Sequence, residues 1–233
     1  MKAYFYRDGY IRTASKIFDI HNLQLGNKFV HLVNDAVQKY SDEYGKYEPA
    51  NKLSYQDFQK YLNTQFTDLN INFERDIIMQ VKKIVTDTIR ATFHLLDSKK
   101  RVNSYELFGY DFMFDSNFKP FLIEVNSNPS LEISSALLQK IFQAMLDNTF
   151  RIAVDPLFPP SGEGFATKKS AEGIDICPEN RFDLIFDERV DAPQLLDRLR
   201  ILDKDVQAEV RDLNDLEPSE GGDDDMEDQE LAA

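Results

Sequence analysis

Two stretches decide the fold: Gly109-Tyr110-Asp111-Phe112-Met113-Phe114-Asp115 and, after a short turn, Phe121-Leu122-Ile123-Glu124-Val125-Asn126-Ser127-Asn128-Pro129. Both are rich in Phe, Ile and Val, and Ser116-Asn117 between them is a turn signal, so the pair predicts an antiparallel β-hairpin. Because side chains alternate faces along a strand, Glu124 and Asn126 share one face. If Asp115 stands opposite Pro120, Asp111 stands opposite Glu124 on that face.

Two opposed carboxylates among apolar side chains repel each other and lose hydration, so this arrangement is disfavoured unless a cation lies between them. Asp111, Glu124 and the Asn126 carbonyl offer three oxygen ligands on one surface. Such an open set suits Mg²⁺ that also binds substrate phosphates. The alternative is a hairpin whose acids point into solvent and bind nothing, and the residues by themselves leave both interpretations open.

The other elements are predicted from periodicity and turn residues. Residues 3–6 and 10–13, joined through Asp8-Gly9, predict a second β-hairpin. Ser54 is expected to cap a helix, and apolar spacing predicts long helices over residues 73–96 and 133–152. Strands interleaved with helices, including an antiparallel hairpin, predict an α+β fold.

Charge divides the 233-residue chain into two parts. Residues 1–160 hold 19 basic and 19 acidic side chains, whereas residues 161–233 hold 8 and 22, so the net charge of −14 lies in the last third. Residues 212–233 are acidic and poor in aromatic residues, which predicts a disordered tail. Residues 161–211 are expected to form a weakly structured extension, with a short strand near 182–186 and a charged helix from about 192 to 210.

Composition also excludes several classes of protein. The single cysteine, Cys177, rules out an internal disulfide framework. No apolar run reaches the roughly 18 residues that cross a bilayer, and the first residues do not form a signal peptide, which predicts a cytoplasmic protein without a membrane span. Lys and Arg are not clustered, so nucleic acid is not an expected partner.

Several ordered motifs resemble the tubulin–tyrosine ligase-like enzymes, a branch of the ATP-grasp ligases. Residues 106–113 with 122–126 resemble the metal-binding signature of that family, and residues 6–15, 31–34 and 44–48 resemble its earlier motifs in the same order. The resemblance covers about residues 4–160 and implies that residues 1–160 are the carboxy-terminal half of an ATP-grasp domain. An earlier half, which supplies the nucleotide-binding lysine in the family, has no counterpart here, which implies a truncated enzyme or a remnant.

The resemblance implies an ATP- and Mg²⁺-dependent reaction. A tubulin carboxylate attacks the γ-phosphate of ATP to give an acyl phosphate, and the amine of a free amino acid then displaces phosphate to form an amide. By their places in the family motif, Asp111, Glu124 and Asn126 are assigned to Mg²⁺ and through it to ATP. The implied protein acts on the carboxy-terminal tail of tubulin, is a monomer when complete, and works in the cytoplasm, at the microtubule cytoskeleton or in the cilium.

Further roles follow from the same motifs. Arg12 is placed on the acceptor carboxylate or the acyl phosphate, because a guanidinium binds such groups through two parallel hydrogen bonds. Asn34 is assigned a catalytic role and His31 a place in cofactor binding, without being a general base. Val33 stands where the family usually has Thr, which removes a hydroxyl, and Lys46 is a weaker candidate for a substrate contact.

The added amino acid stays open in the sequence. Residues 126–132 resemble the polyglutamylating and glycylating branches, whereas residues 45–48 and 158–160 are closer to the tyrosine ligase. A second interpretation also stands, in which the chain is a catalytically inactive remnant that binds tubulin or microtubules.

Overall fold

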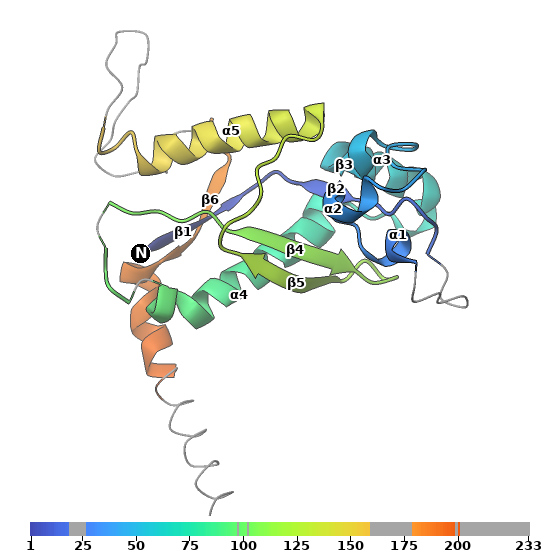
Figure 1. Cartoon of the computed structure of the whole chain (residues 1–233). Coiled ribbons are helices and arrows are strands. Elements are labelled where there is room, and N and C mark those ends of the chain that lie inside the picture. The colour runs from blue at the N-terminus through green and yellow to red at the C-terminus, as the bar shows by residue number, and fades with distance from the viewer. Residues whose placement is uncertain (19–26, 97, 102, 159–178, 199, 201–233) are drawn as a thin grey trace, which may run out of the picture. The chain divides into compact units, whose positions relative to one another are not determined.

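The computed structural model describes residues 1–18, 27–96, 98–101, 103–158, 179–198 and 200 (Figure 1). The chain forms two compact units, Met1–Glu188 and Arg189–Ala233. In the second unit residues 189–198 are helical, which agrees with the start of the predicted charged helix. The rest of that helix and the predicted acidic tail lie outside the described residues. No described helix is long and apolar enough to cross a membrane.

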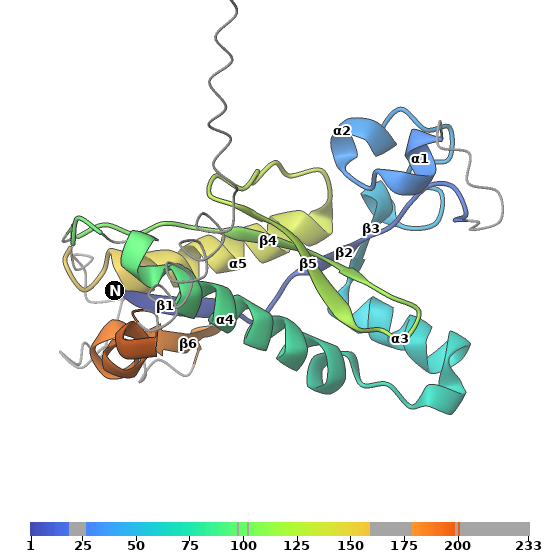
Figure 2. The same cartoon turned by 90° about the horizontal axis from the view of Figure 1, so that it is seen from below.

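The described strands of the first unit pair antiparallel, two by two (Figures 1 and 2). The three pairs are β1 (Lys2–Tyr6) with β6 (Phe182–Asp187), β2 (Tyr10–Arg12) with β3 (Lys52–Ser54), and β4 (Gly109–Phe114) with β5 (Pro120–Asn126). The predicted hairpin of β4 and β5 and the predicted strand near residue 182 are thereby confirmed. Together with the helices, the described residues form a mixed α+β structure.

Helices occupy most of the remaining described chain. They are α1 (Lys28–His31), α2 (Asp35–Gln38), α3 (Tyr55–Gln65), α4 (Met79–Leu96) and α5 (Ala136–Ala153), with 3₁₀ turns η1 (Pro49–Asn51) and η2 (Thr67–Leu69) and a π-helical segment η3 (Phe73–Ile78) that leads into α4. The predicted cap of α3 is confirmed, because the Ser54 hydroxyl accepts a hydrogen bond from the Asp57 backbone at 3.0 Å. Ser135 caps α5 in the same way at 3.3 Å, so this helix begins at Ala136 rather than near residue 133.

The predicted hairpin over residues 3–6 and 10–13 is wrong, because its two strands pair with different partners. β1 pairs with β6, and β2 pairs with β3. Gly9 does not have the positive φ that a two-residue Asp-Gly hairpin turn needs. Its role is steric, since a Cβ at this position would lie 2.3 Å from the Tyr55 hydroxyl oxygen.

Two apolar clusters hold the site strands in place. In the first, the buried residues Leu62, Phe73, Ile77 and Ile78 pack against partly buried side chains that include Ile11 of β2 and Phe114 of β4. In the second, Leu138, Ile141, Phe142 and Met145 of α5 pack against side chains that include Tyr6 and Tyr10. The apolar faces of α3, η3 and α5 therefore support the strands that carry the candidate site.

Ion pairs join β6 to Arg7, which follows β1, and to α4, and a buried ring of β6 also packs against α4. Asp183 pairs with Arg7 at 2.5 Å and with Lys82 of α4 at 2.6 Å. Burial raises the pKa of Asp183, but hydrogen bonds from Arg7 and Lys82 and their charges outweigh this effect and leave that pKa below its ordinary value. Phe186 is 1% exposed, and its ring centroid lies 5.1 Å from that of Phe93.

We expect Phe186→Ala to lower the free energy of unfolding by about 3–5 kcal/mol, because it removes a fully buried aromatic ring. Leu184→Ala is the matched control, since Leu184 lies on the same strand and is 37% exposed. Urea unfolding followed by circular dichroism measures both. Equal losses at the two positions would contradict the packing of β6 described above.

Candidate functional site

The register of β4 and β5 differs from the predicted one near the turn, but Asp111 and Glu124 still lie opposite each other. Asp111 lies opposite Glu124 as predicted, but Pro120 lies opposite Phe114 rather than Asp115. Phe112 pairs with Leu122, so Ile123 is the additional residue of a β-bulge, which restores the Asp111–Glu124 pair. Asp115 serves the turn instead, where its carboxylate accepts hydrogen bonds from two backbone N–H groups.

Polar side chains from three strands converge at this pair of acids. The Asn126 amide nitrogen donates to Asp111 at 3.4 Å and to Glu124 at 3.3 Å. The Arg12 guanidinium, at the end of β2, forms an ion pair with the other oxygen of Asp111. The side chains of Arg12 and Asp111 are 28% and 30% exposed, so the ion pair is half-buried and open to a ligand. The structure thus brings the side chains of Asp111, Glu124 and Asn126 together, with the amide nitrogen of Asn126 rather than its oxygen directed at the two acids.

The donor set of the hairpin fits an open magnesium site. Among the described residues, no three His, Cys, Asp or Glu side chains lie close enough together to hold a metal ion. Two carboxylates and one amide suit Mg²⁺, which usually keeps waters and shares its ligands with substrate phosphates. As placed, the Asn126 amide directs its NH₂ group at both acids, and a half turn of that amide would present its oxygen instead. The metal role of these three residues remains a prediction.

His31 and Asn34 lie outside this group of contacts. His31 ends α1, is exposed, and meets the ring of Phe18 edge-on at 6.1 Å. Asn34 precedes α2 with an exposed side chain that makes no capping hydrogen bond, while its carbonyl accepts from the Gln38 backbone at 3.0 Å. No hydrogen bond among the described residues joins either side chain to the acids of the hairpin. Their predicted roles are neither supported nor excluded by these positions.

Lys46 lies at the surface. Its ammonium group is 5.0 Å from the ring centroid of Tyr47 and 3.7 Å from Glu43, and its side chain is 54% exposed. These contacts are those of a solvated lysine and give no support to a substrate contact.

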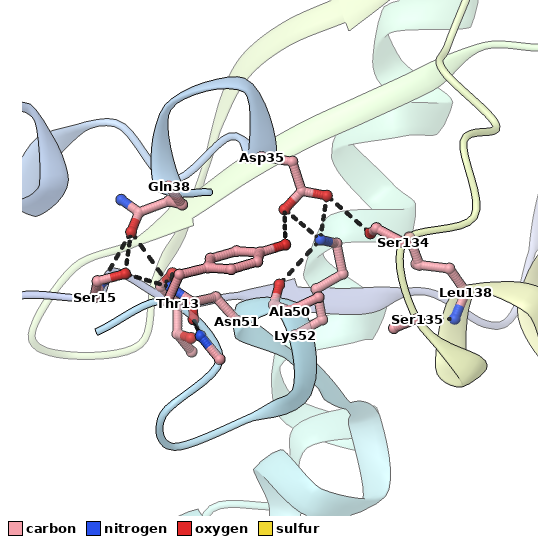
Figure 3. A network of polar contacts seen from close by, with 12 residues as sticks. Thr13, Ser15, Asp35, Gln38, Ala50, Asn51, Lys52, Ser134, Ser135 and Leu138 are labelled. Atoms are coloured by element: carbon pink, nitrogen blue, oxygen red, sulfur yellow. Dashed lines mark hydrogen bonds and ion pairs between the residues drawn. The ribbon is translucent and has the colours of Figure 1, made fainter. Parts of the chain in front are cut away.

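The sequence analysis missed an ion pair beside Arg12 in which the lysine is buried. Lys52 has a side chain that is only 4% exposed, and its ammonium group lies 2.6 Å from both carboxylate oxygens of Asp35 (Figure 3). Asp35 also accepts hydrogen bonds from the hydroxyls of Tyr44 at 3.2 Å and Ser134 at 2.8 Å. Nothing in the sequence marks this lysine, because a partner 17 positions away has no fixed local spacing.

Burial raises the pKa of Asp35, but hydrogen bonds from Lys52, Ser134 and Tyr44 and the charge of Lys52 outweigh it, so that pKa lies below its ordinary value. Ser134 belongs to the segment between β5 and α5, so this carboxylate joins β3, α2 and the chain that follows the acidic hairpin.

The geometry therefore defines an α+β unit with an open acidic site on a β-hairpin and an arginine placed at one of its acids. A model of the Tubulin-tyrosine ligase family matches residues 1–161, and the chain belongs to that family. This confirms the family resemblance noted in the sequence.

Three relatives illustrate the match. The chain is 34% identical over 172 residues to tubulin glycylase 3B of Tetrahymena thermophila, covering 73% of this chain and 14% of that protein. It is 26% identical over 204 residues to human tubulin monoglycylase TTLL3, covering 83% and 23%. It is also 26% identical over 189 residues to the probable α-tubulin polyglutamylase Ttll1 of Tetrahymena thermophila, covering 81% and 43%.

The chain thus spans between 14% and 43% of the length of these three relatives. An alignment that covers 83% of this chain extends past residue 187 even if it begins at residue 1, so the similarity to TTLL3 includes β6. The strand that pairs with β1 therefore belongs to the part of the chain that is shared with this relative.

We expect Asp35→Asn to destabilise the protein in a pH-dependent way. A carboxylate whose pKa is lowered by folding stabilises the folded state above its unfolded pKa of about 3.9, and that contribution is lost as the pH falls through the lower folded pKa. The difference in free energy of unfolding between wild type and Asp35→Asn should therefore be largest above about pH 4 and should shrink below it.

Urea unfolding between pH 7 and pH 2.5, roughly the range of carboxylate titration, measures this difference. Asp87→Asn is the control, because Asp87 is exposed on α4. A difference that stays constant over the whole range would contradict the role of the Asp35 carboxylate.

Proposed function

We propose that this chain is part of the catalytic unit of an ATP-dependent ligase that joins an amino acid to a carboxylate of a tubulin tail. The convergence of Asp111, Glu124, Asn126 and Arg12 in a member of the Tubulin-tyrosine ligase family carries the proposal. The similar proteins are tubulin glycylases and polyglutamylases, which favours tubulin as the acceptor.

In the proposed reaction, an oxygen of the tubulin carboxylate attacks the γ-phosphorus of ATP. The bond from this phosphorus to the β–γ bridging oxygen breaks, and ADP leaves. The amine of the amino acid then attacks the acyl carbon, loses a proton, and displaces phosphate as the amide forms. Because the first step brings two anions together, positive charge and positioning are its main requirements.

The residues of the site meet these requirements. Asp111, Glu124 and Asn126 would hold Mg²⁺, which supplies charge neutralisation at phosphate oxygens when bound. Arg12 uses one terminal nitrogen for Asp111, and a guanidinium has further N–H donors that can bind a carboxylate or a phosphate. Asp111 thus holds Arg12 beside the metal ligands, where the acceptor carboxylate and the γ-phosphate must meet.

Glycine is the proposed amino acid, with glutamate as the second candidate. The identity of 34% to tubulin glycylase 3B exceeds the 31% to the probable tubulin polyglutamylase TTLL9 of Bos taurus, while human TTLL3 and Ttll1 both stand at 26%. The highest of these identities favours glycine, and the incorporation assay described next measures which amino acid is added.

The test is incorporation of labelled glycine, glutamate or tyrosine into purified tubulin with ATP and Mg²⁺. It is measured with this chain and with any longer natural protein that carries it, and mass spectrometry locates the modified residue. We expect glycine on side-chain carboxylates of the tubulin tail. Tubulin binding without incorporation of any amino acid would support the inactive remnant instead.

We expect Glu124→Gln to lower the ligation rate at least about 100-fold without changing the fold, because it removes one of two carboxylates that would bind the metal. Glu74→Gln is the control, since Glu74 is exposed in the first turn of η3. Rates are measured over a series of Mg²⁺ concentrations. If Glu124→Gln ligates as fast as the wild type when Mg²⁺ is limiting, the metal role of Glu124 is refuted.

A further inference from the structure

Gln38 is the most completely buried polar side chain near the candidate site, with 0% exposure at the end of α2. Its carboxamide oxygen accepts hydrogen bonds from the Ser15 backbone at 2.9 Å, the Ser15 hydroxyl at 2.6 Å and the Asn51 amide at 3.3 Å (Figure 3). Its amide nitrogen donates to the backbone carbonyls of Phe29 at 3.1 Å and Leu32 at 2.6 Å. Five hydrogen bonds thus meet on one planar group.

These partners require a carboxamide. The oxygen side faces N–H and O–H donors, while the nitrogen side faces two carbonyl oxygens, so glutamate would lack the donors and an apolar side chain would lack both functions. A buried polar group that loses its hydrogen-bond partner destabilises the folded state. The surroundings of residue 38 therefore require the carboxamide group of glutamine and not only a side chain of the same size.

One side of Gln38 fixes the chain that follows Arg12. Ser15 is three positions after Arg12, and Asn51 holds Thr13, which directly follows Arg12. Thr13 donates its backbone N–H to the Asn51 carbonyl at 3.0 Å, and the Asn51 amide donates back to the Thr13 carbonyl at 3.3 Å. Asn51 also donates to the Ser15 hydroxyl at 2.9 Å. The end of β2 is thereby tied to Gln38 by side-chain and backbone contacts.

The other side of Gln38 fixes the segment that contains His31 and Asn34. The carbonyls of Phe29 and Leu32, which it binds, flank His31 in the chain. The Gln38 backbone N–H also donates to the Asn34 carbonyl at 3.0 Å. A single side chain therefore joins the two segments in which the sequence analysis placed Arg12, His31 and Asn34.

We propose that Gln38 is a positioning residue for Arg12, setting the end of β2 so that the guanidinium meets Asp111 and the acceptor carboxylate. The expected loss in ligation rate rests on the proposed function, whereas the expected displacement of Arg12 does not. A displacement of about 1 Å in a positioning group can cost about 100-fold in rate. If Gln38 contributed only to stability, folded Gln38 variants would keep Arg12 in its wild-type position and would keep the wild-type ligation kinetics.

The test compares Gln38→Met with Asn148→Leu. Asn148 is a matched control, because it is 8% exposed, lies on α5, and its side chain accepts a hydrogen bond from the Arg181 backbone at 2.7 Å, away from Arg12. We expect both variants to lower the melting temperature. We expect Gln38→Met, but not Asn148→Leu, to shift the NMR signal of the Arg12 Nε–H group and lower kcat/KM for a tubulin tail peptide about 10- to 100-fold, with the KM for ATP unchanged.

Ser15→Ala provides a milder second variant if Gln38→Met does not fold. It removes one donor to Gln38 on the Arg12 side, so a smaller shift of the same Arg12 signal is expected. An unchanged Arg12 signal in folded variants at both positions would overturn the proposal. If the wild-type protein shows no ligation but the Arg12 signal still shifts in Gln38→Met and not in Asn148→Leu, the positioning role stands and the proposed function fails.

Discussion

Arg12 and Lys52 stand opposite each other across β2 and β3, and the rest of the site depends on how this pair of like charges is compensated. Directly opposed cations destabilise an antiparallel pair unless each has a partner of opposite charge. Asp111 of β4 meets Arg12, and Asp35 of α2 meets Lys52. The short strand pair β2–β3 thereby connects the acidic hairpin, through Asp111, to the first residue of α2, Asp35.

The cations of the two ion pairs differ in exposure, and this difference suits different tasks. The side chain of Lys52 is 4% exposed, and the Asp35 carboxylate carries hydrogen bonds from two hydroxyls as well, so this pair is a fixed structural connection. Arg12 and Asp111 are about 30% exposed, and the donors of the guanidinium are not all used by the acid. An anion can therefore reach Arg12, whereas Lys52 is closed to ligands.

Sequence reasoning reached the correct pair of acids from a register that was partly wrong. It predicted one uniform register through Asp115 and Pro120, whereas the bulge at Ile123 shifts the outer half of the hairpin by one residue. The dipeptide Asp8-Gly9 is typical of a hairpin turn and predicts one between β1 and β2, but the two strands do not pair with each other. The glycine is instead required by the close approach of the Tyr55 hydroxyl, a neighbour 46 positions away that no local pattern reveals.

The family, the acidic hairpin, the cap of α3 and the long helices could be predicted without a structure, because these depend on periodicity, turn residues and short motifs that are local in the chain. The partners of β1 and β2, the pairing of the buried Lys52 with Asp35 and the five hydrogen bonds of Gln38 could be found only in the folded chain. These contacts join residues that are distant in sequence or at irregular spacing. Their stability comes from burying charges and polar groups that satisfy one another, which can be assessed only once the fold has brought them together.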